Sequence, residues 1–354
     1  MDTQATTPSD EATPADDANE DAWGYSPDVE RAERTAGGAM DTDAIETAVS
    51  GRTALVTGGA GFVGGHIVRA LADDNEVRVL DDLSTGRAAN VPGTATLYEG
   101  DLLDEDLLAE AMAGVDVVFH QAGLVSVPKS IDCPEESNRV NVDGTLAVLE
   151  AAREVDARVV LASSVAIFGD PDTVPIAEGH PKEPSSPYAV DKLAIDHYAR
   201  VYARLYGLDT VALRYFNVYG PGQSGGQYAG VVRTFFDQAE SGGPLTVEGD
   251  GKQTRDFIHV ADVVRANLAA ATTDHVGEAF NIGTGENVTV RELADLIVDA
   301  TDSTVEVVHV EPRQDDIRRS RADASKAKSL LGFAPKVGLE AGLRHLARHR
   351  STDE

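Results

Sequence analysis

The segment VTGGAGFVGG, residues 56–65, decides the fold of this chain. It completes an apolar run, ALVTG at 54–58, and a helix-like segment, HIVRALADD at 66–74, follows it. Glycines in such a turn allow a tight bend, a close approach of the backbone to a pyrophosphate and the packing of a helix on a strand. The spacings G-x-G-x-x-G and G-x-x-G-x-x-G are satisfied here by Gly58, Gly59, Gly61 and Gly64. The segment therefore predicts a dinucleotide site at the start of a βαβ unit.

Further apolar runs of strand length follow the glycine turn. They are VRVLD at 77–81, VDVVFHQAG at 115–123 and RVVLASS at 158–164. Nearly continuous apolar strands that alternate with helices are typical of a parallel sheet covered on both faces. The remaining length of about 300 residues is enough for one such domain and a smaller one. We expect an α/β fold with a Rossmann-type doubly wound parallel sheet and a smaller C-terminal α/β domain.

Asp81 ends the second apolar run, 23 residues after Gly58. A carboxylate at this place accepts hydrogen bonds from the adenosine ribose hydroxyls and repels a 2′-phosphate, which favours NAD over NADP. Arg87 lies close by in the sequence and leaves binding of NADP open.

The chain of 354 residues is strongly acidic, with a formal net charge of −30. The excess is spread along the whole sequence, because 47 acidic and 28 basic residues remain when the first fifty residues are set aside. A field of this sign repels nucleic acids and anionic membranes, so we expect neither as a partner. The composition indicates a surface adapted to molar salt, and an acidic protein at ordinary ionic strength stays open as the alternative.

Residues 1–50 lack any sustained apolar period and are rich in Asp, Glu, Ala, Thr and Pro. We predict a disordered acidic tail, because such a segment buries too little surface to offset its ordering entropy. The start of the chain resembles no signal peptide, and no stretch approaches the roughly 18 apolar residues of a membrane span. Cys133 is the single cysteine, which fits a reducing compartment. A cytoplasmic location is therefore expected.

The segment SSPYAVDKLAIDHYARVYARLYG, residues 185–207, predicts a helix. Ser185 or Ser186 is a suitable N-cap, and Pro187 is pre-organised for the first turn.

Tyr188 and Lys192 lie at positions i and i+4 of this predicted helix and share one face. An ammonium neighbour and a positive nicotinamide both favour the phenolate, so the tyrosine is suited to act as a base near neutral pH. Upstream, a predicted strand ends at Ser163 and Ser164, at the sheet edge where ligands of open α/β sheets bind. These residues form the candidate catalytic group.

Five motifs, in this order and spacing, resemble the extended short-chain dehydrogenase/reductase family. They are VTGGAGFVGG (56–65), the Ser-Ser-x-x-x-Phe-Gly run (163–169), YAVDK (188–192), LRYFNVYGPGQ (213–223) and TRDFIHVAD (254–262). The resemblance covers roughly residues 53–345, and within the family the chain looks like a nucleotide-sugar epimerase of the UDP-glucose 4-epimerase type. It implies NAD as cofactor, a UDP-sugar as substrate and a helix-paired homodimer.

The resemblance also implies roles for single residues. Ser164 matches the catalytic hydroxyl, Tyr188 the base and Lys192 the residue that holds the nicotinamide ribose. The implied cofactor contacts are Gly58, Gly61, Phe62, Val63, Gly64, Asp81, Asp82, Asp101, Leu102, Gln121, Ala122, Gly123, Asn141, Tyr188, Lys192 and Phe216. The implied substrate contacts are Ser126, Ser164, Asn217, Arg255, Arg313 and Ser320, with Ser320 facing the sugar C2 substituent. No metal ligand is expected, since His345 and His349 have the spacing of a ligand pair without a third ligand nearby.

The same matching divides the chain into parts. Residues 51–220 form the NAD-binding Rossmann domain, to which 255–275 return, and 221–350 mainly form the nucleotide-sugar-binding domain. The implied reaction inverts C4 of a UDP-hexose, either UDP-glucose/UDP-galactose or the N-acetylhexosamine forms, through a transient 4-keto sugar.

Several rival activities share this scaffold. Related 4,6-dehydratases carry an Asp-Glu pair directly after the catalytic hydroxyl, and decarboxylases usually carry Glu at its second position, whereas Val165 and Ala166 stand here. Both activities are therefore disfavoured. An NAD(P)H-dependent reductase of a keto sugar, or another sugar-nucleotide epimerase, stays open. A non-catalytic NAD sensor is disfavoured because both Tyr188 and Lys192 are present.

We expect the fold to loosen in dilute buffer, because self-repulsion at a net charge of −30 is screened only when salt shortens the Debye length to about 3 Å at 1 M. Circular dichroism during stepwise desalting measures the loss of secondary structure, with sucrose in place of salt as the control. Full retention of secondary structure and activity after desalting would reject the idea.

Overall fold

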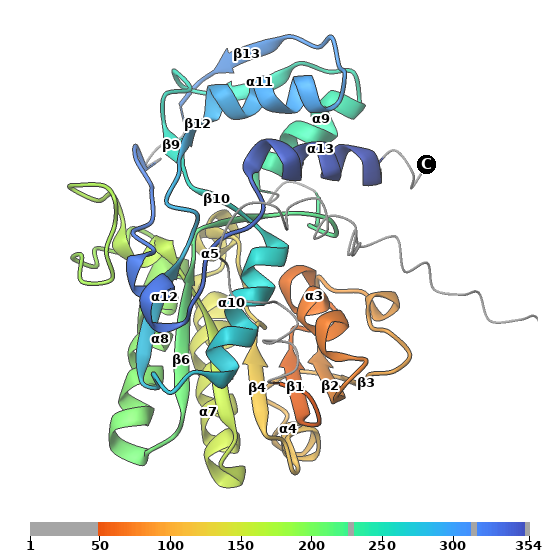
Figure 1. Ribbon diagram of the computed structural model, residues 1–354, viewed down its shortest axis with the longest axis vertical. Helices are drawn as coiled ribbons and strands as arrows, with labels where there is room; N and C mark the ends of the chain where they lie inside the picture. The colour runs from red at the N-terminus through yellow and green to blue at the C-terminus, as the bar shows by residue number, and fades with distance from the viewer. Residues whose placement is uncertain (1–48, 226–229, 313–316, 351–354) are drawn as a thin grey trace, which may run out of the picture.

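The computed structural model describes residues 49–225, 230–312 and 317–350. Its centre is a seven-stranded sheet in which every neighbouring pair of strands is parallel (Figure 1). The strands are β1 (Thr53–Thr57), β2 (Glu76–Asp81), β3 (Thr96–Glu99), β4 (Val117–His120), β5 (Arg158–Ser164), β6 (Thr210–Tyr215) and β11 (Glu278–Ile282). Their order is β11-β6-β5-β4-β1-β2-β3, so the direction of winding reverses between β1 and β4. In open α/β sheets, ligands bind outside the carboxyl ends of the strands at such a reversal.

Helices cover both faces of this sheet, as the apolar strands require. One face carries α3 (Phe62–Leu71), α10 (Val260–Thr272) and α12 (Ser325–Leu330), and the other carries α4 (Glu105–Met112), α7 (Gly144–Val155) and α8 (Pro187–Tyr206). Successive residues of β1 point to opposite faces, so Val56 belongs to one core and Leu55 to the other, both fully buried. The predicted doubly wound sheet is confirmed.

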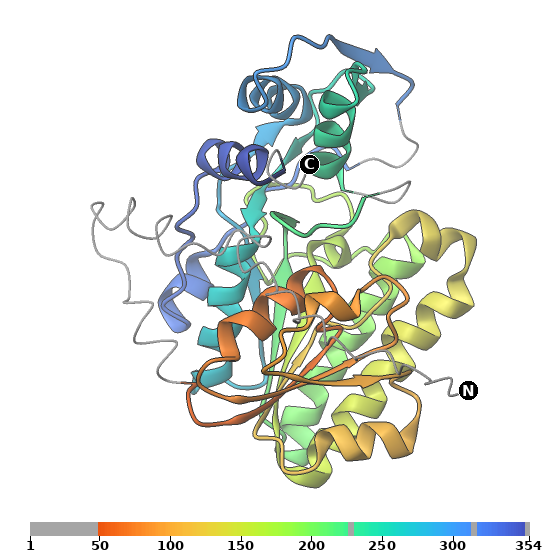
Figure 2. The same ribbon diagram turned by 90° about the vertical axis from the view of Figure 1, so that its right-hand side faces the viewer.

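A smaller C-terminal part lies beyond the carboxyl ends of the large sheet (Figures 1 and 2). It contains α9 (Val231–Glu240), β8 (Leu245–Glu248), α11 (Val290–Ala300), β13 (Val307–Val310) and α13 (Leu339–Arg350). These elements enclose a core of their own, which includes Phe235, Phe236, Leu293 and Leu343. The expectation of a smaller C-terminal α/β part is met.

Two short strand pairs connect the large and the small part. The first pairs β7 (Asn217–Tyr219) with β10 (Phe257–His259), and the second pairs β9 (Thr254–Arg255) with β12 (Val288–Thr289). The chain then returns to the large sheet through α10 and β11, and β11 lies beyond the return segment 255–275 that we predicted. The domain boundary near Pro221 stays a prediction.

Short helices connect the strands at the candidate site. They are η2 (Ala88–Asn90), α5 (Val127–Asp132), α6 (Pro134–Asn138), the π-helical turn η3 (Arg139–Asp143) and η4 (Val165–Phe168). Within the described ranges, no helix is both long and apolar enough to cross a membrane. The predicted acidic tail, apart from residues 49 and 50, lies outside the described residues.

Candidate active site

The glycine turn between β1 and α3 is shaped by close backbone contacts. Gly58 has a φ of +68°, and a Cβ there would lie 2.7 Å from the amide nitrogen of Ala122. A Cβ on Gly64 would overlap the carbonyl oxygen of Gly58. The helix α3 begins after Gly61 without any side-chain cap, so its first N–H groups remain at the turn, where an anion is favoured. This cradle fits the pyrophosphate of a dinucleotide.

Asp81 stands at the carboxyl end of β2, against the glycine turn. One carboxylate oxygen accepts a hydrogen bond from the Ala60 amide and the other from the Leu83 amide, both at 2.9 Å. Burial raises the pKa of Asp81, while these two amides oppose the rise. A carboxylate has about four acceptor positions, so lone pairs remain for ribose hydroxyls. Asp82 is exposed, and its carboxylate accepts from the amide and hydroxyl of Ser84.

Asn141 supports the segment that follows β4. It is buried in η3, where its side chain accepts from the Leu124 amide at 3.0 Å and donates to the Leu124 carbonyl at 3.1 Å. A Cβ on Gly123 would lie 2.7 Å from the Asn141 side-chain oxygen and 3.5 Å from the ammonium nitrogen of Lys192. The close approach explains why glycine is needed between the cofactor turn and the candidate catalytic helix.

The other predicted cofactor contacts differ in burial and in their hydrogen-bond partners. Gln121 is bonded through its amide to Asn267 at 3.2 Å and to the Tyr215 hydroxyl at 3.2 Å. Leu102 is buried, and the carboxylate of Asp101 is paired with Arg139 at 2.9 Å. The positions of the remaining predicted contacts follow from their elements: Phe62, Val63 and Gly64 lie in the first turn of α3, Ala122 follows β4, and Phe216 is buried after β6.

The structure brings Ser164, Tyr188 and Lys192 together. Ser164 is the last residue of β5 and Tyr188 lies in the first turn of α8, where the Ser164 hydroxyl is near enough to the phenol to oppose the rise of its pKa. Lys192 donates from its ammonium to the Ala162 carbonyl at 2.9 Å, and this nitrogen lies 6.0 Å from the centre of the Tyr188 ring. The predicted start of α8 is confirmed, since Ser186 caps the helix by accepting from the Ala189 amide.

Burial shifts both titrating groups toward their neutral forms. It raises the pKa of Tyr188, and the hydrogen bond with Ser164 opposes the rise. It lowers the pKa of Lys192 to about 8, and the Asp191 carboxylate opposes the fall. We expected the Lys192 ammonium and a positive nicotinamide together to favour the phenolate. In the protein alone the pKa of Tyr188 is raised instead, because desolvation by burial is the largest cause.

The predicted substrate contacts lie on adjacent segments between the two parts. Asn217 begins β7 and donates from its side chain to the Asp256 carbonyl at 2.9 Å. Arg255 ends β9, and its guanidinium donates to the Thr254 carbonyl at 2.8 Å. Ser320 is only 4% exposed, and its amide also donates to the Thr254 carbonyl, at 3.1 Å. Among the described residues, its buried hydroxyl has no hydrogen-bond partner, so it is an atom that a ligand can satisfy.

Of the two remaining predicted substrate contacts, the structure describes only Ser126. Ser126 is the N-cap of α5, where its hydroxyl accepts from the Lys129 amide at 3.1 Å. Arg313 lies outside the described residues.

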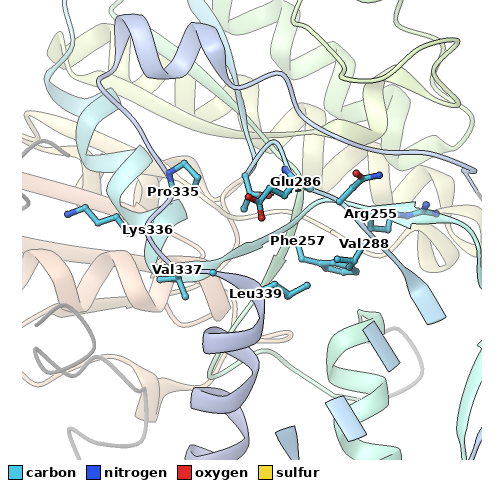
Figure 3. A pocket seen from close by; sticks show the side chains of 11 residues that line it. Arg255, Phe257, Glu286, Val288, Pro335, Lys336, Val337 and Leu339 are labelled. Carbon is cyan, nitrogen blue, oxygen red and sulfur yellow. Dashed lines mark hydrogen bonds between the residues drawn. The ribbon is translucent and has the colours of Figure 1, made fainter. Parts of the chain in front are cut away.

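A pocket of about 260 Å³ adjoins Arg255 (Figure 3). It lies between the β9–β12 pair, the loop before β12 and the segment 335–339, with Phe257, Glu286 and Lys336 in its lining. Of the predicted site residues that the structure describes, its lining includes only Arg255, so it is not the location of the candidate catalytic group. In the described ranges, no cluster of three or more His, Cys, Asp or Glu side chains is placed to hold a metal ion.

Sequence reasoning missed residues that hold the catalytic helix. The hydroxyl of Ser130 accepts from the Tyr188 amide at 3.1 Å. Asp196, buried on α8, pairs with the buried Arg214 of β6 through two bonds of 2.7 and 2.9 Å and accepts from Ser163 at 3.2 Å. Asp196 lies four residues after Lys192 and so shares the helix face of Tyr188 and Lys192. The same i+4 spacing could therefore have pointed to Asp196.

Comparison with known proteins agrees with this geometry. Residues 54–283 match the NAD dependent epimerase/dehydratase family. A protein named putative UDP-glucose 4-epimerase from Methanocaldococcus jannaschii is 40% identical over 296 residues, which cover 82% of this chain and 96% of that relative.

Two solved structures are similar over most of the chain. The UDP-glucose 4-epimerase of Thermotoga maritima with UDP-glucose has a TM-score of 0.82 and 38% identity, covering 85% of this chain and all of that one. The UDP-N-acetylglucosamine 4-epimerase of Methanobrevibacter ruminantium, in complex with UDP-N-acetylmuramic acid, has a TM-score of 0.83 and 35% identity, covering 86% of this chain and all of that one. With its glycine cradle and its serine, tyrosine and lysine at the end of β5, the chain belongs to the NAD dependent epimerase/dehydratase family, a group of extended short-chain dehydrogenases/reductases whose cofactor is NAD.

Proposed function

We propose that the protein inverts C4 of a UDP-hexose, with NAD as cofactor and a transient 4-keto sugar as intermediate. The substrates of the proposal are UDP-glucose and UDP-galactose, together with their N-acetyl forms. One arrangement carries it: Ser164 ends β5, Tyr188 lies in the first turn of α8, and the Lys192 ammonium donates to the Ala162 carbonyl of β5 and lies 6.0 Å from the centre of the Tyr188 ring. The names of the similar proteins support the same class of activity.

Tyr188 is the base of the proposed reaction. Its phenol oxygen takes the proton of the sugar O4 hydroxyl, and Ser164 shares this proton through its hydrogen bond. Bound NAD supplies the acceptor for the hydride that leaves C4 and the donor for the hydride that returns. The proton then goes back from Tyr188 to O4, so the cycle closes without net oxidation or reduction.

Lys192 contributes charge and position. Its pKa of about 8 leaves the ammonium largely protonated at pH 7, where it favours the phenolate of Tyr188. The bond to the Ala162 carbonyl and the close approach to Gly123 hold this ammonium between β5 and the segment after β4.

The UDP end of the substrate is held by fixed polar groups in this proposal. Asn217 and Arg255 lie on neighbouring short strands, and the guanidinium of Arg255 suits a diphosphate because it stays charged and presents a planar set of donors. Arg313 is included among the residues proposed to hold UDP on the ground of sequence matching alone. The keto sugar must turn while the UDP end stays bound, so the binding energy belongs far from the reacting carbon.

The rival reactions lack an acid or base at the expected place. Val165 and Ala166 begin η4 directly after Ser164, and neither side chain can move a proton. An Asp-Glu pair there would allow loss of water or support decarboxylation, so the apolar pair favours epimerisation.

We also propose a homodimer formed through α7 and α8. These two helices pack against each other on one face of the sheet, and they carry exposed apolar side chains: Val155, Val190, Tyr198, Leu205 and Tyr206. Leu205 is 62% exposed, and the proposal rests on its occurrence with the other exposed apolar side chains of the same two helices, which a partner surface would cover. The proposal includes a cytoplasmic location, on the ground of the single cysteine.

A panel of UDP-sugars tests the proposed activity. We expect purified protein in high salt to equilibrate UDP-glucose with UDP-galactose, and UDP-N-acetylglucosamine with its C4 epimer, without added reductant. Chromatography measures the epimers, and absorbance at 340 nm follows NADH. Net consumption of NADH or NADPH with a keto sugar, or no interconversion of any pair, would contradict epimerisation and favour the reductase.

Replacing Tyr188 by Phe should lower kcat about 10²- to 10⁴-fold, because a positioned general base is lost. Folding and NAD content should remain, since the ring and its packing are kept. Tyr98→Phe, on the edge strand β3 and outside every proposed contact, is the matched control and should retain full activity. Near-normal turnover by Tyr188→Phe would reject its role.

Replacing Ser320 by Tyr tests the sugar pocket. We expect kcat/KM for UDP-N-acetylglucosamine to fall at least about tenfold, or about 1.4 kcal/mol, because the larger side chain occupies the space of the C2 substituent. UDP-glucose turnover should be spared and shows that the variant folds. Ser329→Tyr, on the exposed face of α12, is the control. Equal losses on both sugars, or no loss on either, would show that Ser320 does not face C2.

A further inference from the structure

Asp256 is a buried carboxylate between the proposed substrate residues. It follows Arg255 directly and is fully buried. One carboxylate oxygen accepts from the amide of Thr284 at 2.8 Å and from its hydroxyl at 2.6 Å. The other accepts from the Gly285 amide at 2.9 Å and from the Ala322 amide at 3.0 Å. All four acceptor positions of the carboxylate are therefore used by this chain.

The backbone of Asp256 makes a further connection. Its carbonyl oxygen accepts from both the amide and the side chain of Asn217, at 3.0 and 2.9 Å. Asn217 begins β7, which pairs with β10 immediately after Asp256. One residue thus orients Asn217 through its carbonyl and adjoins Arg255 through the peptide bond.

The side-chain bonds reach the segment of Ser320. Ala322 lies two residues beyond Ser320, and the Ser320 amide is bonded to the Thr254 carbonyl on the other side of Arg255. The hydrogen bond from the Ala322 amide to Asp256 and the one from the Ser320 amide to the Thr254 carbonyl together hold residues 320–322 along β9. A third segment, 284–285, is held by the remaining bonds of the carboxylate.

The atoms around the Asp256 carboxylate are closely packed, so its position is tightly constrained. A Cβ on Gly283 would lie 2.9 Å from a carboxylate oxygen of Asp256 and 2.7 Å from the Cβ of Ala322. Within the described ranges, no ion pair to a lysine or arginine is recorded for Asp256, so backbone amides supply most of its stabilisation. Amides at fixed positions make the carboxylate a geometric link between the segments.

We propose that Asp256 is a positioning residue that sets the spacing of Arg255 and Asn217 for the nucleoside diphosphate end of the substrate. This proposal rests on the proposed function, because that function places UDP on these residues. Asp256 does not touch the reacting atoms. Its effect should therefore appear in the binding of the nucleotide and leave the chemical step largely unchanged.

The variant Asp256→Asn tests the link. An amide has one oxygen, and its nitrogen would direct N–H groups at the amides of Gly285 and Ala322. We expect KM for the UDP-sugar and Kd for UDP alone to rise at least about tenfold, while kcat changes less than about threefold and bound NAD is retained. Titration calorimetry with UDP gives Kd, and initial rates give kcat and KM.

Asp262 offers a matched control in the same motif. Its buried carboxylate likewise accepts from backbone amides, of Lys336 at 2.7 Å and Val337 at 3.1 Å, and pairs with Arg265. It fixes the segment 336–337, which lines the pocket beside Arg255 but carries none of the proposed substrate contacts. Asp262→Asn should lower the melting temperature as Asp256→Asn does, yet change Kd for UDP less than about threefold.

The milder variant Thr284→Val keeps the proposal testable if Asp256→Asn fails to fold. It removes the 2.6 Å hydroxyl bond to Asp256 and leaves the three amide bonds in place. We expect a rise in Kd for UDP of about threefold or more, with kcat preserved. Equal rises in Asp256→Asn and Asp262→Asn, or an unchanged Kd in the foldable Asp256 or Thr284 variant, would overturn the positioning role.

The same measurements separate this proposal from the proposed function. Wild-type protein that binds UDP without epimerising any UDP-sugar would reject the function, while the comparison of Kd values would still decide the role of Asp256. Wild-type protein that binds no UDP would overturn both proposals.

Discussion

The approach of the glycine turn to the segment after β4 is the contact on which the rest of the site depends. At Gly58 the two backbones come so close that a Cβ would lie 2.7 Å from the Ala122 amide nitrogen. This contact sits where the winding of the sheet reverses, and it sets the distance between the start of α3 and the end of β4. Gly123, one residue further on, brings Asn141 and Lys192 to the same place. A methyl group at Gly58 would separate the cofactor cradle from the catalytic helix.

Buried carboxylates in this acidic chain are stabilised in two different ways. Asp196 is paired with Arg214 and Arg200, and these charges and hydrogen bonds hold its pKa below the usual range. Asp81 and Asp256 rely on backbone amides, and burial raises the pKa of both. The first arrangement anchors α8 to the sheet by charge. The second places oxygen atoms at defined positions, which suits residues that line or shape a ligand site.

The sequence predicted the parts of the fold that depend on local patterns. The glycine turn, the capped start of α8 and the pairing of Tyr188 with Lys192 all follow from spacing within one element. Ser130 and Asp256 act through partners that are distant in the sequence, such as Ala322, and these partners do not follow from the local pattern, although Asp256 lies within the TRDFIHVAD motif. The burial that raises the pKa of Tyr188 was missed for the same reason, because it is produced by packing between segments.

The Tyr188 and Lys192 side chains are best understood as one titrating pair. Burial alone favours a neutral phenol and disfavours the ammonium, so each charge is costly when it stands without the other. When Tyr188 loses its proton, the phenolate and the ammonium stabilise each other in the same desolvated space, and their titrations become coupled. A raised pKa makes the phenolate a stronger base toward the sugar hydroxyl and the neutral phenol a weaker acid. In the proposed epimerisation, which gives the proton back to the sugar within each cycle, a nearby ammonium offsets the second effect by stabilising the phenolate.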